Sequence, residues 1–478
     1  AQKSGKQPFF CWAHFYDPHA PYEPPEPFAT RYSSSLYDGE IAYVDKVTGE
    51  ILDSLKRQGL FERTVIIVTS DHGESLGEHV EKTHGYFIYE STQLVPLIWK
   101  SPGERYQPGH TAGTVRLIDI APTVLQQLGI RAPAVMQGTG LVRELLGRPG
   151  PALQAYAESY YPRLQFGWSE LRSLYRFPYK YIEAPQPELY DLETDPNEKL
   201  NLIESRRSIA NSLRDQLMEL IERYSPSTEL EQEEIDAETA AALASLGYVT
   251  LSAGTSVDDD SYQDLPDPKD KVSIYVETTE TYSLIRKGKY PEAIRSFEKI
   301  LREDPTATFV YHSMGTTYSK MGRDKEAVDA FLKAAKTFPS DATLFFNMGS
   351  SYLRLADWEN AEKCLDKAIE LDPTHFRARG NLASLWLQQG RFEEALEASL
   401  EILQKHPNYE VGLFDAGVAS AALGKAKAAI EYLEKARQVN PQNPRTYQYL
   451  SQLYDAAGEP EKAQEYLSKA KELGVKPR

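Results

Sequence analysis

The sequence contains few cysteines and no long apolar run, and both absences narrow the kinds of protein it can be. Only two of its 478 residues are cysteine, Cys11 and Cys364, one in each half of the chain. Two such residues cannot form a disulfide framework, so we expect two buried free thiols. No stretch of eighteen apolar residues occurs, and the sequence therefore predicts no membrane-spanning segment.

Basic residues are scarce relative to acidic ones. The chain has 53 lysines and arginines against 70 aspartates and glutamates, which gives a formal net charge of −17. An acidic chain without a basic stripe argues against nucleic acid as a partner. Between residues 225 and 270, twelve acidic residues face one basic residue, Lys269. Such a run is typical of a solvated linker.

A strict 34-residue period runs through the second half of the chain. Small residues at this period let two helices approach closely, while glycine ends the first helix of a pair and proline follows the second. Helix–turn–helix units of this length stack side by side, so the period predicts an all-α tetratricopeptide repeat (TPR) solenoid of six units over residues 272–478. The prolines at this period are Pro305, Pro339, Pro373, Pro407 and Pro441, and the alanines run from Ala293 to Ala463.

An array of this kind binds other proteins, and its first helices line the concave face. We therefore expect a protein or peptide ligand there. Asn347 and Asn381 occupy equivalent places in neighbouring repeats, where TPR proteins often hold a peptide backbone, and they are our candidate peptide-binding residues. Asparagine is also common at that place without a ligand. The aromatic residues of the same face, Tyr275, Phe309, Phe346 and Phe414, fit packing better than a ligand box.

The acidic segment 225–271 precedes the repeats and is rich in acid and serine. One short apolar patch within it, Ala240 to Val249, could dock onto a neighbour. We therefore interpret 225–271 as an acidic linker with a short docking segment.

Residues 1–224 alternate predicted strands and helices. The chain opens on an apolar run, Phe9–Phe15, without a charged and apolar leader, so we expect it to begin inside a domain. Leu36–Gln58 has helical periodicity, and Thr64–Thr69 is a β-branched run typical of a strand buried on both sides of a parallel sheet. Val95–Trp99 predicts another strand and Leu117–Leu128 another helix. The predicted fold class is α/β, with a sheet covered by helices.

Histidines and carboxylates gather near the ends of these predicted strands. Asp71, His72 and Gly73 follow the Thr64–Thr69 run after a single serine. Ligands collect beyond the carboxyl ends of strands in an open parallel sheet, where an Asp oxygen and a His nitrogen can reach one divalent ion. The alternative is an Asp that caps the following turn beside an exposed His.

Two further loops carry candidate histidines. In Asp17-Pro18-His19-Ala20-Pro21-Tyr22 the prolines stiffen the loop, and a preorganised His19 can donate a hydrogen bond to an anionic oxygen. A structural proline-rich turn is the alternative. Lys82 and His84 could place positive charge near an anion, and an ordinary solvated pair is the alternative there.

Together these segments resemble the sulfatases of the alkaline phosphatase superfamily. The resemblance covers nearly all of residues 8–250 and implies an alkaline-phosphatase-like sheet with flanking helices. ELYDLETDPNEKLNL is similar to the closing segment of that domain, and LASLGYV before the repeats is similar to sulfatase-like proteins that carry a TPR array. The other matching segments are FFCWAHFYDPHAPY, YDGEIAYVDKVTGEILDSLKRQGLFERTVIIVTSDHGESLGEH, THGYFIYESTQLVPLIW and VRLIDIAPTVLQQLGI.

The resemblance also assigns expected roles to individual residues. Asp71 and His72 match the second pair of metal ligands, and His19 matches the histidine that contacts the sulfate group. His84 stands where members carry a Lys or His that contacts the sulfate or assists the leaving group, and the nearby Lys82 is a substrate-binding candidate. The implied cofactor is one divalent ion, calcium, manganese or zinc, and imidazole at position 72 suits manganese or zinc better than calcium.

Two elements of the sulfatase pattern are absent from the sequence. Neither Cys11 nor Cys364 stands in the C-x-P-S-R motif whose cysteine becomes the formylglycine nucleophile, and the paired acidic ligands that open the metal site are missing. In the family both lie upstream of the DPHAPY loop. We therefore expect residues 1–224 to be the C-terminal part of a sulfatase-like domain, with formylglycine upstream of Ala1 and no catalysis by this chain alone.

The implied activity of the parent protein is hydrolysis of a sulfate ester. Related members of the superfamily hydrolyse phosphonate or phosphate esters or transfer phosphoglycerol, and these activities remain alternatives. A non-catalytic TPR scaffold is the third interpretation.

Overall fold

The computed structural model describes residues 8–103, 106, 108–111, 113–224 and 259–474. Its described residues form two compact units, the first made of the residues up to 224 together with 259–272 and the second beginning at Ser273. The predicted docking segment Ala240–Val249 and the linker up to residue 258 lie outside the described residues. The predicted fold class, an α/β part followed by an all-α repeat solenoid, is confirmed.

Helix α2 (Leu36–Arg57) is the longest helix of the first unit and matches the helix predicted from periodicity. The Ser35 side chain caps its first turn by accepting a hydrogen bond from the Asp38 backbone, and Lys56 and Arg57 place positive charge in its last turn. Gly39 and Glu40 are its buried residues, and both lie against the proline-rich loop described below.

The predicted parallel sheet is not what the first unit contains. Strand β1 (Ile66–Thr69) pairs antiparallel with β2 (Leu97–Lys100) in a two-stranded sheet. Val68 is 37% exposed and Ile98 is 61% exposed, so this run is not buried on both faces. The expectation was wrong because a run of β-branched residues reports strand propensity, whereas pairing direction and burial depend on the neighbouring strands.

The expected strand Phe9–Phe15 is also wrong, because residues 8–16 form no regular element. Phe10 and Trp12 are 85% and 77% exposed, and Cys11 is an exposed free thiol. The expectation of two buried thiols therefore fails for Cys11 and holds for Cys364, which is free and buried. An apolar run is buried only where another element covers it, and no backbone ladder or helix orders this segment.

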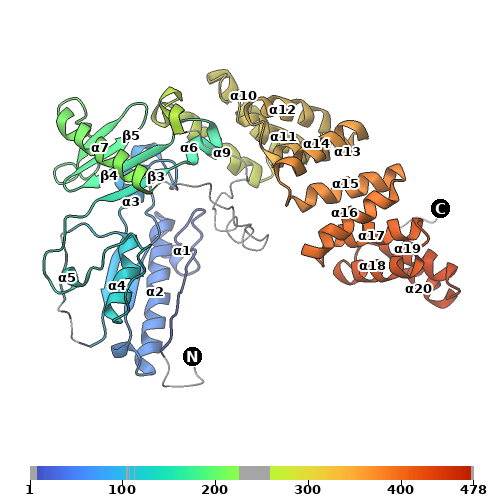
Figure 1. Ribbon diagram of the computed structural model, residues 1–478, viewed down its shortest axis with the longest axis horizontal. Coiled ribbons are helices and arrows are strands. Elements are labelled where there is room, and N and C mark those ends of the chain that lie inside the picture. Colours follow the sequence, from blue (N-terminus) through green and yellow to red (C-terminus); the bar gives the residue numbers. More distant parts are fainter. Residues whose placement is uncertain (1–7, 104–105, 107, 112, 225–258, 475–478) are drawn as a thin grey trace. The chain divides into compact units, whose positions relative to one another are not determined.

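A four-stranded antiparallel sheet in the order β3-β4-β5-β6 forms the core of the first unit (Figure 1). Helix α7 (Arg207–Tyr224) packs on β4 and β5, and its Leu213 and Leu217 meet Leu174, Tyr181 and Leu189 of the sheet. Burial of such large apolar side chains contributes about 2 kcal/mol each. The strands are Ala155–Ser159, Leu171–Arg176, Tyr179–Glu183 and Glu188–Asp191.

Residues 259–271, the end of the segment predicted as a linker, contact the first unit. Two short 3-10 helices, η4 (Asp259–Asp264) and η5 (Pro268–Lys271), occupy this stretch. The Tyr86 hydroxyl donates to the Pro268 carbonyl at 2.7 Å, and the Tyr262 hydroxyl donates to Glu183 at 2.9 Å. This segment is therefore tied to the sheet and to the segment that follows His84.

The remaining elements of the first unit are short and connect the two sheets. The predicted helix over Leu117–Leu128 is present as η3 followed by α4. Among the described residues, none of the helices combines the length and the apolar character that crossing a membrane requires. These short elements are α1 (Phe28–Arg31), η1 (Phe61–Arg63), η2 (Glu78–Val80), α3 (Glu90–Gln93), η3 (Leu117–Asp119), α4 (Ile120–Gln127), α5 (Val142–Leu145) and α6 (Tyr161–Phe166).

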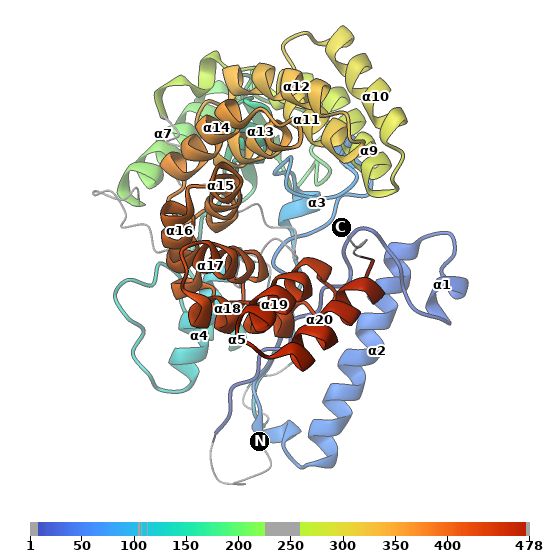
Figure 2. The same ribbon diagram turned by 90° about the vertical axis from the view of Figure 1, so that its right-hand side faces the viewer.

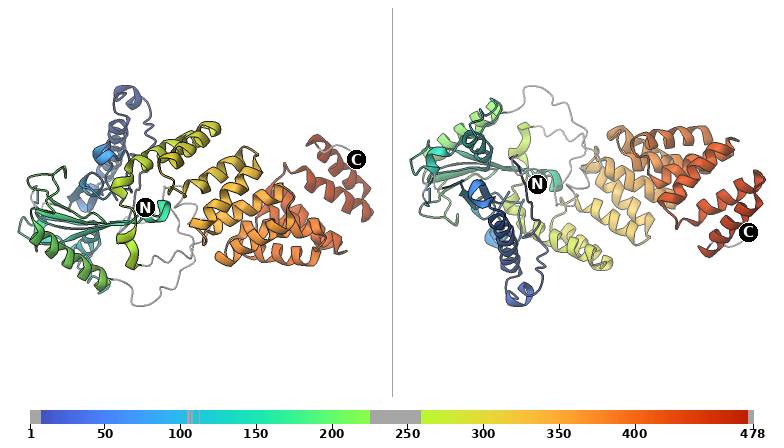
Figure 3. Two further views of the ribbon diagram at one scale, coloured as in Figure 1. Left: turned by 90° about the horizontal axis from the view of Figure 1, so that it is seen from above. Right: turned by 90° about the horizontal axis from the view of Figure 1, so that it is seen from below.

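The second unit consists of helix pairs that follow one another in chain order (Figures 2 and 3). The 34-residue period works through small residues at the helix crossings. A Cβ atom on Gly315 would lie 2.5 Å from the Phe331 ring, so only glycine lets these two helices approach so closely. The first helices are α9 (Val272–Arg286), α11 (Val310–Lys320), α13 (Ala342–Arg354), α15 (Phe376–Gln389), α17 (Glu410–Ala422) and α19 (Pro444–Ala456), and the second helices are α10 (Tyr290–Glu303), α12 (Asp324–Thr337), α14 (Trp358–Leu371), α16 (Phe392–Lys405), α18 (Ala426–Val439) and α20 (Pro460–Glu472).

Candidate functional site

Three of the predicted site histidines meet in the first unit, although they come from three separate loops. The ring centroids of His72 and His84 are 3.9 Å apart with the rings stacked, and those of His19 and His84 are 5.1 Å apart. His84 therefore lies between the other two. All three are partly buried, which leaves an imidazole edge open to a ligand.

His72 and Asp71 follow the carboxyl end of β1, as the sequence predicts. His72 Nδ1 lies 2.9 Å from the Gly73 carbonyl oxygen, which can only accept, so Nδ1 carries the proton. The other nitrogen, Nε2, then holds the lone pair and lies 3.9 Å from Asp71 Oδ1. Two ligand atoms at about 2.1 Å from one ion can be at most about 4.2 Å apart, so this pair lies within reach of one divalent ion.

Asp71 also accepts a hydrogen bond from the His72 backbone nitrogen at 3.1 Å. The capping role that the sequence left open is thus present beside the donor geometry. A bond of this kind is compatible with metal binding, because each carboxylate oxygen has two lone pairs.

Gly73 brings the site loop close to helix α3. Its backbone nitrogen donates to the Thr92 carbonyl at 2.8 Å, and a Cβ atom here would lie 2.4 Å from the Ser91 carbonyl oxygen. The glycine is required for this backbone contact. The contact fixes the position of the loop relative to α3.

His19 is held by its own loop and by helix α2. Its Nδ1 lies 2.7 Å from the Ala20 carbonyl and therefore carries the proton, which leaves Nε2 for a substrate. The carboxylate of Glu40 accepts from the His19 backbone nitrogen at 3.2 Å and from the Glu23 backbone nitrogen at 2.6 Å. Burial raises the pKa of Glu40, although these two hydrogen bonds oppose the shift.

Glu40 reaches the loop because its neighbour in the sequence is glycine. A Cβ atom on Gly39 would lie 2.9 Å from the Pro24 side chain, so a larger residue would push α2 away from the loop. The sequence did not single out Glu40. Nothing in its local pattern distinguishes it from a solvated glutamate on a helix surface.

Glu74 links His84 to the proline-rich loop. Its Oε2 lies 3.0 Å from His84 Nδ1, and its Oε1 accepts from the Tyr22 hydroxyl at 2.9 Å. The Glu74 side chain is only 3% exposed. Burial, and then the nearby Glu74 carboxylate, raises the pKa of Tyr22, and the same two causes raise the pKa of Tyr37.

The segment that follows His84 is among the most buried of the first unit. Tyr86 and Ile88 are 0% and 1% exposed, and the backbone nitrogens of Tyr86 and Phe87 donate to Glu81. Burial raises the pKa of Glu81 to about 7. His84 is thus attached to a rigid part of the core, which limits its movement.

Glu74 also belongs to a cluster of possible metal ligands. The nitrogen and oxygen atoms of His72, Glu74 and His84 lie within 4.8 Å of one another, and among the described residues this is the one group of three side chains that could hold a metal ion. The sequence pointed to Asp71 with His72 and missed Glu74. The signal was present in the run Asp71-His72-Gly73-Glu74, where a carboxylate follows two residues after the histidine.

Lys82 and the remaining histidines of the first unit are not members of this group of three. Lys82 is exposed on the loop two residues before His84. His14 and His110 are also exposed. His79 stacks on Tyr89 with ring centroids 3.6 Å apart, and burial lowers its pKa, as expected for a histidine that fills space in the core.

The two predicted peptide-binding asparagines lie on first helices of the second unit, and both are half-buried. Asn381 Nδ2 donates to Ser350 of the preceding repeat at 2.9 Å. The next repeat makes the equivalent bond between Ser384 and Asp415 at 2.5 Å, also 31 residues apart. Asn381 therefore joins neighbouring repeats in this structure. The four predicted aromatic residues of this face are buried, as packing requires.

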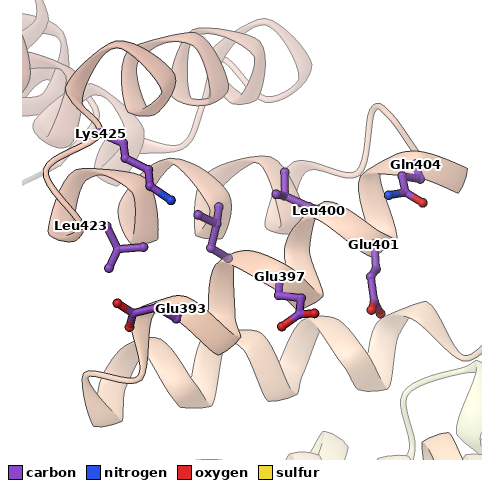
Figure 4. A pocket seen from close by; sticks show the side chains of 8 residues that line it. Glu393, Glu397, Leu400, Glu401, Gln404, Leu423 and Lys425 are labelled. Carbon is purple, nitrogen blue, oxygen red and sulfur yellow. The ribbon is translucent and has the colours of Figure 1, made fainter.

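A shallow groove lies on a different face of the repeats, along the second helix α16 (Figure 4). Three glutamates at a spacing of one helical turn, Glu393, Glu397 and Glu401, line it together with leucines, and Lys425 lies at its end. The first helices that carry Asn347 and Asn381 do not contribute to it. The groove is thus separate from the predicted peptide site.

Family models match both parts of the chain. The model described as Sulfatase matches residues 1–130, and the model of the N-sulphoglucosamine sulphohydrolase C-terminal region matches residues 77–223. The model of the cilia and flagella-associated protein 70 C-terminal domain matches residues 222–477, which is more than half of the chain.

Individual relatives match the first part only. Arylsulfatase K of Bos taurus is 30% identical over 203 residues, which is 39% of this chain and 36% of the relative. Choline-sulfatase of Rhizobium meliloti is 33% identical over 184 residues, 37% of this chain and 34% of the relative. The chain therefore spans about a third of the length of the curated relatives it matches.

Among solved structures, MamA from Desulfovibrio magneticus is similar at 22% identity and a TM-score of 0.33, over 35% of this chain and 94% of that one. The family models, and not this structural similarity, assign the two parts of the chain to their families. This chain belongs to the sulfatase family in its N-terminal part and, in its C-terminal part, to the TPR family matched by the cilia and flagella-associated protein 70 C-terminal domain.

Proposed function

We propose that the first unit is the metal-binding part of a sulfuric ester hydrolase. The observation that carries the proposal is the meeting of His19, His72 and His84, each with Nδ1 bound to a protein oxygen. That common arrangement directs every Nε2 toward binding rather than toward the fold. The names of the relatives, arylsulfatase K and choline-sulfatase, support sulfate esters as the substrate class.

In this proposal each histidine has a separate task. In its imidazolium form, with a proton on each nitrogen, His19 donates a hydrogen bond from Nε2 to a sulfate oxygen and stabilises its charge. His84 takes up a second proton at Nε2 and gives it to the leaving oxygen as the ester S–O bond breaks, while Nδ1 keeps its own proton toward Glu74. Lys82, exposed near His84, adds positive charge at the entrance for an anionic substrate.

Asp71 and His72 would hold a divalent ion, manganese or zinc in preference to calcium because imidazole is a ligand. When bound, such an ion polarises the ester and lowers the pKa of a nucleophile beside it. The Gly73 carbonyl holds the His72 ring so that Nε2 is already oriented for this role. We further propose that formylglycine supplies the nucleophile from sequence upstream of Ala1.

Turnover of an aryl sulfate tests the proposal. We expect no turnover from the 478-residue chain, and metal-dependent turnover from a protein that adds an upstream sulfatase segment with the C-x-P-S-R motif. In that protein, His19→Ala and His84→Ala should each lower kcat by about a hundredfold or more. His110→Ala alters an exposed histidine of the same unit and should leave kcat unchanged.

Metal binding is tested on the 478-residue chain itself by calorimetric titration with manganese or zinc. Asp71→Asn and His72→Ala should each weaken binding at least tenfold, as expected when a ligand is lost. Equal affinities in all three proteins would argue against this site. Hydrolysis of an aryl phosphate or phosphonate in place of the sulfate would favour the related esterases.

For the second unit we propose binding of a protein or peptide segment on the face of the first helices. Asn347 is the better candidate for a direct contact, because the Asn381 amide already donates to Ser350. On a set of immobilised peptides, Asn347→Ala should no longer bind the peptides that the wild-type chain binds. Glu393→Ala, in the separate groove of α16, should retain them.

A further inference from the structure

We infer that Glu74 is a positioning residue that fixes the proton of His84 on Nδ1 and so presents Nε2 to the substrate. This inference rests on the proposed function for its catalytic meaning. The arrangement itself can be tested without turnover.

The carboxyl group of Glu74 makes hydrogen bonds to two separate loops. Glu74 Oε2 lies 3.0 Å from His84 Nδ1, while Glu74 Oε1 accepts from Tyr22 at 2.9 Å. The partners stand ten and fifty-two residues from Glu74 in the sequence, so the contacts join separate loops. One side chain therefore sets both the His84 ring and the loop that carries His19.

Burial makes this contact strong. The Glu74 side chain is 3% exposed and the His84 side chain is 23% exposed, so little water competes for the hydrogen bond. The hydrogen bond between the Glu74 carboxyl group and the ring N–H is therefore stronger than the same contact in water. The proton thus stays on Nδ1, and Nε2 is left to exchange a proton with a ligand.

Glu74 could instead be a metal ligand, because its oxygens lie near His72 as well as His84. Both of its oxygens accept a hydrogen bond, and ligation would have to use their remaining lone pairs without moving the Glu74 side chain from the proline-rich loop. Asp71 offers His72 an oxygen at 3.9 Å without disturbing these bonds. The hydrogen-bond pattern favours a positioning role over ligation.

The experiment is a ring-nitrogen NMR measurement on the metal-free 478-residue chain labelled with 15N-histidine. The resonances of His84 are assigned from the spectrum of His84→Asn. We expect His84 to show the Nδ1–H form in the wild type. In Glu74→Ala it should shift to a mixture with Nε2–H, while His110 keeps its signals.

Tyr22→Phe is the matched control, because it removes the other hydrogen bond of Glu74 and leaves His84 Nδ1 its acceptor. It should preserve the His84 tautomer. If Glu74→Ala lowers the helical signal in circular dichroism, Glu74→Gln keeps the shape and should still populate the Nε2–H form in part. An unchanged His84 tautomer in folded Glu74 variants would overturn the inference.

A metal titration separates positioning from ligation. If Glu74→Gln weakens manganese or zinc binding as much as Asp71→Asn does, Glu74 is a ligand and the inference is wrong. We expect the metal affinity of Glu74→Gln to stay within about threefold of the wild type, because both proposed ligands, Asp71 and His72, remain. Failure of the aryl sulfate assay would leave this result and the tautomer result intact.

Discussion

The two units cover their apolar side chains to very different extents. Among the described residues, the repeat unit exposes three large apolar side chains, those of Leu332, Trp358 and Val439. Nineteen such side chains are exposed between Phe9 and Leu146. Contiguous exposed apolar surface in soluble proteins marks places that meet another molecule or segment. The repeat unit thus covers nearly all of its large apolar side chains, whereas the part of the first unit that carries the candidate site leaves many of them exposed.

The separation in the sequence between contacting residues explains part of this difference. In the repeats, Gly315 packs against Phe331 in the next helix, and the same contact recurs between Gly349 and Leu365. In the first unit, Tyr86 bonds to Pro268, 182 residues away. A repeat array gains stability from each neighbour in turn, but the first unit needs distant segments at once.

The largest expected effect breaks the repeat packing. Phe331→Ala should destabilise the repeat unit by about 4 kcal/mol, because the fully buried ring leaves a cavity against Gly315. Its neighbour Leu332 is 47% exposed, so Leu332→Ala should cost less than about 1 kcal/mol. Urea unfolding of residues 273–478, followed by circular dichroism, measures both. Similar midpoints for the two variants would contradict the packing argument.

A buried carboxyl gives the repeat unit a predicted pH dependence. Burial raises the pKa of Asp415 from 3.8 to about 7, although the Ser384 hydrogen bond and Arg445 oppose the shift. The folded state therefore holds a proton that the unfolded state loses, and this contribution to stability is present at low pH and lost as the pH rises toward 7.

Between pH 5 and pH 8 the repeat unit should lose on the order of 2 kcal/mol of unfolding free energy through Asp415. Asp415→Asn should abolish that part of the slope, since its amide does not titrate. Urea unfolding at the two pH values compares the proteins. Parallel slopes in wild type and variant would show that Asp415 does not hold this proton.

A substitution at Gly73 tests the packing of the first unit, which carries the candidate site. Gly73→Ala should cost about 2 kcal/mol, because its Cβ atom would lie 2.4 Å from the Ser91 carbonyl and the backbone has to move. The control is Gly49→Ala on helix α2, where no atom lies within 4 Å and alanine should stabilise the helix by up to about 1 kcal/mol. Thermal unfolding should place the two variants on opposite sides of the wild type.

The smallest expected effect on stability concerns the exposed apolar surface. Ile98→Thr on β2 should change the unfolding free energy by less than about 0.5 kcal/mol, because the side chain is 61% exposed. Binding of the apolar dye ANS should fall in the same variant. Ile182→Thr, buried in the four-stranded sheet, is the control and should instead lower stability. Unaltered dye binding by Ile98→Thr would show that another surface binds the dye.

The repeat array was predictable because its interactions recur at one sequence period. Each helix pair shows the same small and large residues, so the pattern predicts each helix and also the helix that it packs against. Helix α2 was predictable for a similar reason. The pairing direction of β1 was not, because a run of β-branched residues contains no information on which strand lies beside it.

The candidate site was predictable only through its motifs. His19, His72 and His84 were named from short segments that resemble one family, and the structure brings these three together. Glu40 was not named, since it acts through a residue far along the chain. Glu74 was given no role, although it follows His72 in the same short run. Long-range hydrogen bonds to ordinary glutamates have no local signature.

The column of residues at positions 347, 381 and 415 has a consequence for any segment bound along the first helices. The repeats are alike in shape, yet this column reads Asn347, Asn381 and Asp415, an amide, an amide and a carboxyl that is buried. A segment displaced by one repeat would find the same backbone spacing but different chemistry. In the segment binding proposed above, these unlike side chains, two of them already bonded to serines of the preceding repeat, would make neighbouring repeats unequal positions for one segment.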